Sequence, residues 1–299
     1  MYQPPESLYP FESHWLNISG LRMHYLDEGP RDAPVVLMVH GNPTWSFYYR
    51  NLVLALRDRY RCIVPDHIGC GLSDKPGDDR YTYTLSQRIS DLGALMDHIR
   101  PATPLHLVVH DWGGMIGFGW AIERPAQIGN MVIGNTAAFR MPAEKKLPAT
   151  LKLVRNTKIG ALLVQGLNAF SGIAARVAFK KPVSAGIRKA YTGPYDSWDN
   201  RIATLRFVQD IPLGPEDPSY GIVQRTEARL PEFAGKPCLL AWGGKDFVFD
   251  RHFLKQWQRI FPHAQVLEYA DCGHYIFEDG GPSLMLAVRE FLDKNEHAG

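Results

Sequence analysis

The sequence lacks the features that mark several protein classes. It has only four cysteines, Cys62, Cys70, Cys238 and Cys272, and no two of them form a C-x-x-C pair. Cysteines scattered in this way exclude a small disulfide scaffold and a compact zinc site. They are typical of core side chains in proteins of the reducing cytoplasm, where we expect this protein. No apolar run approaches the roughly 18–20 residues of a membrane span.

An excess of one charge is also missing. Lysine and arginine number 33 against 31 acidic residues, a net charge of +2 that gives no reason to expect a nucleic-acid partner. The segment 1–6 has no basic stretch before an apolar one, so no signal peptide is expected. No phosphate loop, metal cluster or dinucleotide fingerprint occurs, and we expect neither a cofactor nor a metal.

Short apolar runs alternate with helical patterns along most of the chain. The helical patterns include 84–99 and 254–260, and this alternation predicts an α/β fold with a mostly parallel sheet flanked by helices. The expected buried strands are 21–26, 35–39, 60–64, 105–109, 131–134, 237–242 and 266–269.

The rhythm breaks between residues 136 and 213. No buried strand is evident there, while helical patterns recur at 149–163 and 188–191. The segment is too long for a simple loop. We interpret it as an inserted helical cap, so that residues 1–135 and 214–299 form the core domain and 136–213 the cap domain.

Asp111 follows the expected strand 105–109 and precedes a helix whose first turns contain Gly113, Gly114 and Gly117. This layout is that of the nucleophile elbow G-x-S-x-G, with aspartate in place of serine and Val109 in place of the first glycine. A carboxylate can attack carbon without first losing a proton. A helix N-cap is the structural alternative, but the glycines exceed what a cap requires.

Two more candidate residues follow later strands. Asp246 comes after strand 237–242, and His274 follows the last strand. Nucleophile, acid and histidine in this chain order match the α/β-hydrolase arrangement. Asp250 is the alternative acid, but it lies further from the strand end. Asn135 occupies the place where some α/β-hydrolases carry the acid, and an asparagine there favours Asp246.

The loop His40–Thr44 follows strand 35–39. Loops at the carboxyl ends of parallel strands meet at one edge of a sheet. Asn42 would therefore hold a hydrogen-bond donor near Asp111, although Asn-Pro and glycine also form ordinary turns. We expect His40, His67 and His110 to be structural.

With these residues in place, the sequence resembles the aspartate-nucleophile branch of the α/β-hydrolase superfamily, which includes haloalkane dehalogenases and epoxide hydrolases. The pair His40–Thr44 and His110–Gly114 is similar to the dehalogenase pattern. That resemblance implies that Asn42 and Trp112 donate N–H bonds to the leaving group. Epoxide hydrolases add cap tyrosines, for which Tyr191 and Tyr195 are the candidates here.

The stretches Pro194–Trp198 and Asn200–Pro212 resemble a narrower group, the dehalogenase-like β-lactone decarboxylases of bacterial long-chain olefin biosynthesis. This resemblance implies conversion of a long-chain cis-β-lactone to an olefin and carbon dioxide, with Asp111 as nucleophile. Asn42 and Trp112 would stabilise the developing carboxylate. Haloalkane dehalogenase is the alternative activity. An epoxide hydrolase and a non-catalytic ligand-binding scaffold are weaker ones.

A hydrophobic substrate calls for an apolar tunnel, for which Leu162, Leu163, Phe170 and Phe207 are candidates. The cap is also basic: segment 140–206 contains 13 lysines and arginines against three acids, a balance of +10 in a chain of +2. Such a surface favours docking to an acidic partner or an anionic membrane. The alternative is an ordinary solvent-exposed helical surface. The resemblance implies a β-lactone synthetase as the partner.

Overall fold

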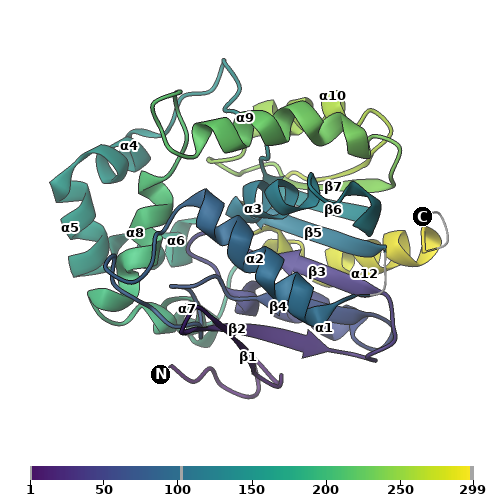
Figure 1. Cartoon of the computed structure of the whole chain (residues 1–299), viewed down its shortest axis with the longest axis horizontal. Coiled ribbons are helices and arrows are strands. Elements are labelled where there is room, and N and C mark those ends of the chain that lie inside the picture. Colours follow the sequence, from purple (N-terminus) through teal and green to yellow (C-terminus); the bar gives the residue numbers. More distant parts are fainter. Residues whose placement is uncertain (1, 102–103, 297–299) are drawn as a thin grey trace.

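The computed structural model describes residues 2–101 and 104–296, which form an eight-stranded sheet with helices on both faces (Figure 1). Its strands are β1 (His14–Ile18), β2 (Leu21–Glu28), β3 (Val35–Val39), β4 (Arg61–Pro65), β5 (Leu105–Asp111), β6 (Ile128–Thr136), β7 (Cys238–Gly243) and β8 (Gln265–Tyr269).

The strand order is β1-β2-β4-β3-β5-β6-β7-β8. The pairs β1–β2 and β2–β4 are antiparallel, and every other pair is parallel. The predicted fold class is therefore confirmed. The carboxyl ends of β3, β5, β6 and β7 come together at one edge, because parallel neighbours end on the same side.

The central strands are buried on both faces. Along β3, Val35, Leu37 and Val39 belong to one apolar core, whereas Val36 and Met38 belong to the other. Successive side chains of a strand point to opposite faces, so a continuous apolar run feeds two cores at once.

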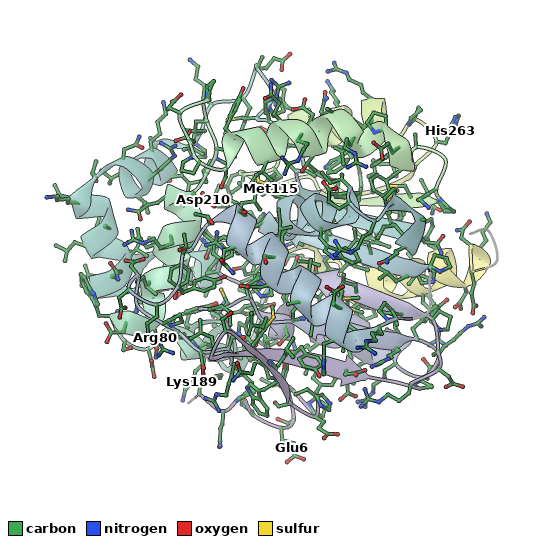
Figure 2. All side chains as sticks on the ribbon, in the orientation of Figure 1. Glu6, Arg80, Met115, Lys189, Asp210 and His263 are labelled. Carbon is green, nitrogen blue, oxygen red and sulfur yellow. The ribbon has the colours of Figure 1, made fainter. Side chains whose placement is uncertain are left out.

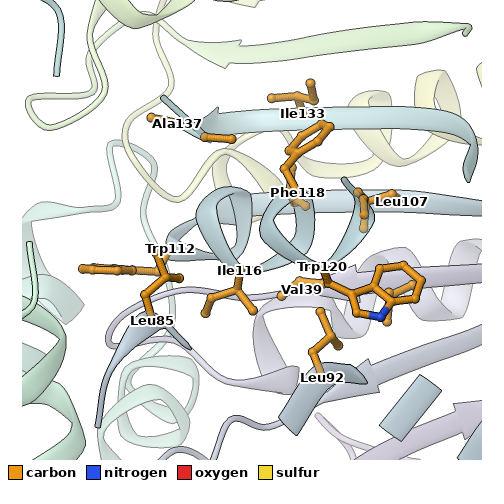
Figure 3. Packing of buried hydrophobic residues seen from close by; sticks show 14 of the residues in the cluster. Val39, Leu85, Leu92, Leu107, Trp112, Ile116, Phe118, Trp120, Ile133 and Ala137 are labelled. Carbon is orange, nitrogen blue, oxygen red and sulfur yellow. The ribbon is translucent and has the colours of Figure 1, made fainter. Parts of the chain in front are cut away.

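Seven helices cover the two faces of the sheet. One face carries α2 (Leu85–Ile99), α3 (Trp112–Ala121), α9 (Tyr220–Arg229) and α10 (Arg251–Ile260), and the other carries α1 (Arg50–Leu56), α11 (Ile276–Asp279) and α12 (Gly281–Lys294). Figure 3 shows the first of these cores, in which Phe118 of α3 lies beside Ile133 of β6.

Five further helices connect β6 to α9 and gather at one end of the sheet (Figure 1). We call them the inserted helices. They are α4 (Ala149–Asn156), α5 (Lys158–Leu167), α6 (Ala169–Val177), α7 (Ala185–Thr192) and α8 (Ile202–Gln209).

The predicted helix 149–163 is wrong as a single element. It consists of α4 and α5, which meet at Thr157. The Thr157 hydroxyl accepts a hydrogen bond from the Gly160 N–H at 2.9 Å and so caps the start of α5. A threonine that hydrogen-bonds backbone in this way competes with a continuous helix, and the apolar periodicity does not register it.

Two strands also differ from expectation. β1 was not predicted, because it is an edge strand whose alternate residues are exposed and which has no continuous apolar run. β6 extends beyond the predicted 131–134 at both ends. Asn130 and Asn135 interrupt its apolar run, although both are buried.

Gly113 permits the close approach of α3 to β3, since a Cβ at this position would overlap the Val39 carbonyl oxygen. We expect Gly113→Ala to lower the free energy of unfolding by about 1–3 kcal/mol, because backbone must move to admit the methyl group. Gly172→Ala in α6 is the matched control. No atom lies within 4 Å of its added Cβ, so this change should raise stability by about 0.5–1 kcal/mol.

Urea unfolding of both variants provides the measurement. An alanine at position 113 that leaves the unfolding midpoint unchanged would contradict the need for this close approach.

Candidate active site

Asp111 lies at the turn from β5 into α3. Its backbone has φ of 51° and ψ of −127°, a conformation that residues other than glycine rarely adopt. The Asp111 side chain does not cap α3, which removes the alternative interpretation of this residue as a helix cap. Thr136 donates a hydrogen bond to the Asp111 carbonyl and helps to hold the turn. The turn presents the carboxylate at the sheet edge.

The two oxygens of the Asp111 carboxylate have different surroundings. Oδ1 accepts a hydrogen bond from the Asn42 backbone N–H at 2.6 Å. A Cβ at position 41 would overlap Oδ1, so Gly41 is needed for the loop after β3 to approach this closely. Oδ2 lies 3.6 Å from His274 Nε2. Oδ2 is therefore the oxygen available for chemistry.

His274 connects the two carboxylates. Its Nδ1 is 2.8 Å from Asp246 Oδ2, while its Nε2 faces Asp111. All three side chains are at least nine-tenths buried. The structure thus brings together the three residues that the sequence analysis selected from the ends of different strands.

Asp246 has two donors besides His274. Asn135 Nδ2 donates to Asp246 Oδ2 at 2.9 Å, and the Val248 N–H donates to Oδ1 at 2.7 Å. The rival Asp250 instead begins α10, where it pairs with Lys145 at 2.7 Å and accepts from the His252 N–H. Asp250 is therefore directed away from His274.

Opposing effects set the pKa values in this cluster. Burial raises the pKa of Asp111, and this outweighs the lowering by the His274 charge and by the backbone N–H groups of Asn42 and Trp112. For His274, burial lowers the pKa, but the Asp246 charge, its hydrogen bond and the Asp111 charge more than compensate, so the net shift is upward. The imidazolium form is stabilised by a carboxylate on each side.

Asn42 and Trp112 line the cavity into which the Asp111 carboxylate points. Asn42 Nδ2 donates to the Thr204 carbonyl of α8 at 3.0 Å, while its Oδ1 is buried with no partner among the described residues. This bond fixes the amide between the core and the inserted helices. Trp112 begins α3, and its side chain lines the cavity next to Asp111.

The buried Arg88 lies near Trp112, against the Phe207 ring. The Arg88 guanidinium lies 3.6 Å from the centre of the Phe207 ring and 5.8 Å from that of Trp112. It pairs with Asp210 at 3.3 Å, at the N-terminal end of α2 (Figure 2). Phe207 therefore packs on Arg88 and Trp112 and does not line the cavity.

The histidines expected to be structural have structural contacts. His110 Nε2 lies 2.8 Å from the His274 carbonyl oxygen, and this contact positions the backbone of His274. His67 Nε2 is 3.0 Å from the His40 carbonyl oxygen, which joins the loops after β3 and β4. On the open side of His274, the Phe249 ring stacks on the imidazole at 5.9 Å between centres.

A cavity of about 460 Å³ extends from Asp111 into the inserted helices. Its wall is mainly hydrocarbon from the segment that follows β6 and from α4, α5, α6 and α8. Leu163 and Phe170 line it as the sequence suggested, whereas Leu162 faces solvent. The ionisable side chains in the wall are Asp111, His274 and Lys145.

Lys145 and three phenylalanines of the wall were missed by sequence reasoning. Lys145 is the first residue of the basic pair 145–146, but its side chain is only 14% exposed and pairs with Asp250. Phe139, Phe249 and Phe253 come from segments far apart in the chain. No spacing in the sequence indicates that they share one cavity.

Tyr191 and Tyr195 do not reach the Asp111 carboxylate. The Tyr191 hydroxyl donates to Glu278 at 2.8 Å within a buried group that includes Arg50. The Tyr195 hydroxyl donates to the Thr44 carbonyl at 3.3 Å. Neither residue lines the cavity, so the structure gives no support to an epoxide hydrolase with these two proton donors. Within residues 2–101 and 104–296, no cluster of His, Cys, Asp or Glu is arranged to hold a metal ion.

Comparison with known proteins agrees with this geometry. Residues 34–281 match the family model described as alpha/beta hydrolase fold, and the chain belongs to this family. Over 97% of the chain and 91% of the relative, it is 55% identical to a protein of Shewanella oneidensis named cis-3-alkyl-4-alkyloxetan-2-one decarboxylase. A protein of Xanthomonas campestris with the same name is 48% identical over 92% of this chain and 94% of its own.

The fold is likewise that of a haloalkane dehalogenase. The crystal structure of such an enzyme from Bradyrhizobium elkani superposes with a TM-score of 0.85 at 26% identity, covering 97% of this chain and all of the other. The predicted resemblance to dehalogenase-like decarboxylases is confirmed.

Asp246 and Asp250 offer a matched test of the geometry. Asp246→Asn removes the charge that raises the pKa of His274, so burial should dominate and the pKa should fall. Asp250→Asn should leave the pKa of His274 unchanged, because Asp250 contacts Lys145 and His252 instead.

NMR titration of ¹⁵N-histidine-labelled protein measures this pKa directly. Equal values in wild type and Asp246→Asn would show that Asp246 does not act on His274.

Proposed function

We propose that this protein is a β-lactone decarboxylase, which converts a cis-3,4-dialkyl-oxetan-2-one to an alkene and carbon dioxide. An oxetan-2-one is a β-lactone, and both relatives described above carry this activity in their names. The observation that carries the proposal is a carboxylate, Asp111, with one oxygen facing His274 at the base of a mainly apolar cavity.

The reaction balances with Asp111 alone as the nucleophile. Asp111 Oδ2 attacks C4, the alkyl-bearing ring carbon that is bonded to the ring oxygen. The bond between C4 and the ring oxygen breaks and releases a carboxylate. This carboxylate then leaves as carbon dioxide. Its carbon–carbon bonding pair forms the alkene, while the bond to Asp111 breaks and returns its electron pair to the aspartate. No water is consumed.

Asn42 and Trp112 would stabilise the carboxylate that forms on ring opening. Both border the cavity beside Asp111, and the Asn42 amide is already oriented by Thr204. Donors fixed in a water-poor site stabilise developing charge without reorganising. The charge of Arg88 behind Trp112 adds to the favourable potential. The inserted helices would serve as a cap that closes this site above the sheet edge.

The cavity supports an alkyl-substituted substrate. Its volume is within the roughly 300–1,000 Å³ of small-molecule sites, and its wall offers few polar groups that a shorter, polar substrate would need. Because the cavity is open at the inserted helices, an alkyl chain can extend beyond it. With a long-chain lactone as substrate, the proposed reaction would belong to olefin biosynthesis. The four cysteines are free and buried, which supports a reducing compartment such as the cytoplasm.

Haloalkane dehalogenase is the second candidate, because the same residues can displace a halide. In that reaction His274 activates water, which attacks the carbonyl carbon of the Asp111 ester and leaves its oxygen in the aspartate. The two reactions therefore differ in the fate of a water oxygen.

Turnover in H₂¹⁸O separates the two candidates. With a long-chain cis-β-lactone, we expect alkene and carbon dioxide, and mass spectrometry of the peptide that contains Asp111 should show no ¹⁸O. A bromoalkane under the same conditions should release no appreciable bromide. Asp111→Ala should form no alkene.

Bromide release with ¹⁸O in Asp111, and no alkene from the lactone, would assign dehalogenase activity instead. No turnover of either substrate would favour a ligand-binding scaffold.

Trp112→Phe tests the stabilisation of the carboxylate. The variant keeps a ring against Phe207 but loses the indole N–H, so kcat for alkene formation should fall about 10²-fold, as for loss of one donor to a developing anion. Trp120→Phe is the control in the same helix, because the Trp120 N–H is buried without a described partner and Trp120 does not line the cavity. Steady-state kinetics measure both, and equal kcat values would remove Trp112 from this role.

A further inference from the structure

The outermost of the inserted helices exposes hydrocarbon to solvent. On α5, Ile159 is 67% exposed, Leu162 57% and Leu167 74%. Trp198 is 48% exposed and lies against the same helix, since a Cβ at position 166 would contact both its ring and Leu162. We call Ile159, Leu162, Leu167 and Trp198 the apolar patch. Figure 1 shows α5 at the edge of the molecule.

The patch is not the unavoidable result of packing α5. The inner face of that helix is already apolar, with Val164 buried, so the outer face could carry charged residues as most surface helices do. No single described helix is long and apolar enough to cross a membrane, but α5 and α6 pass as a pair bent by 74°. Each covers about 15 Å, half of the thickness of the bilayer core.

The substrate cavity opens among exposed apolar side chains of the same region. Leu153 of α4, Ile173 and Val177 of α6, and Phe247 all line the cavity and are also 40–52% exposed. They define the mouth of the cavity. A mouth with a hydrocarbon rim, set on the helices next to the patch, offers a water-insoluble chain an entrance that it can reach without crossing solvent.

Cations without ion-pair partners accompany the patch. Lys152, Lys158 and Arg176 are exposed on α4, α5 and α6, and none forms a salt bridge with another described residue. In contrast, Lys145 and Arg155 are held by Asp250 and Asp217. Exposed hydrocarbon and cations without a described ion-pair partner on α4–α6, with a tryptophan packed beside α5, match the boundary between headgroups and acyl chains of an anionic bilayer.

We propose that α4–α6 dock on an anionic lipid bilayer. The apolar patch inserts at the level of the headgroups, Lys152, Lys158 and Arg176 contact lipid phosphates, and the cavity mouth faces the membrane. The exposed side chains of the patch offer one polar group, the Trp198 indole, whereas a specific protein interface needs about one hydrogen bond per 100–200 Å². The route of substrate entry rests on the proposed function, but the docking itself does not.

Cosedimentation with vesicles tests the docking. Wild type should bind phosphatidylglycerol/phosphatidylcholine vesicles at low salt, and less well at 0.5 M salt or to pure phosphatidylcholine, because salt and neutral lipid weaken the charge attraction. Leu162→Ser/Leu167→Ser should bind at least tenfold more weakly. The matched control Leu54→Ser/Leu286→Ser, which alters exposed leucines of α1 and α12, should bind as wild type does.

The charge contribution has its own variant. Lys158→Glu/Arg176→Glu should lose most binding to the anionic vesicles while its binding to phosphatidylcholine stays that of wild type. Circular dichroism and urea unfolding should match wild type for every variant, which excludes loss of fold as the cause.

Absence of wild-type binding at low salt, or equal binding by the patch variant, would overturn the proposal. Binding to a purified β-lactone synthetase that the patch variant abolishes, with no vesicle binding, would assign the surface to that protein instead. With detergent-dispersed lactone, the patch variant should form alkene at the wild-type rate. Failure of wild type to form alkene there would reject the proposed function and leave the vesicle result standing.

Discussion

The hydrogen bond from the Asn42 backbone to the Asp111 carboxylate is the constraint on which this site depends. It joins the loop after β3 to the turn after β5, and it leaves one oxygen of the nucleophile free. The contact requires a strained backbone at Asp111 and the absence of a side chain at Gly41. Strain of this kind costs about 1–3 kcal/mol and persists only where surrounding structure enforces it. The apolar cores on both faces of the sheet provide that enforcement.

The electrostatics follow from the same placement. Burying a charged carboxylate at a sheet edge has a large desolvation cost. His274 reduces this cost, because Asp246 on its other side favours the protonated imidazolium. Asn135 and Val248 then satisfy Asp246. Asp111, His274 and Asp246 are thus each oriented by a neighbouring polar group before any substrate arrives.

The inserted helices combine two properties that a soluble surface usually separates. Their inner faces form an apolar cavity above Asp111, and the outer face of α5 is apolar as well. The unpaired cations of α4–α6 accompany that surface. Together they are the basis of our proposal that the enzyme takes a water-insoluble substrate from a membrane surface rather than from solution.

The sequence by itself determined the α/β fold class and the residues Asp111, Asp246 and His274, because buried strands are continuous apolar runs and catalytic side chains follow their carboxyl ends. The same local reasoning missed β1 and placed one helix over 149–163, since edge strands and a capping threonine leave little apolar signal. Only the tertiary structure decided that Asp250 contacts Lys145, that Lys145 enters the cavity wall and that Phe207 does not. Those outcomes depend on how distant segments pack and where each side chain then points, and no spacing along the chain encodes that geometry.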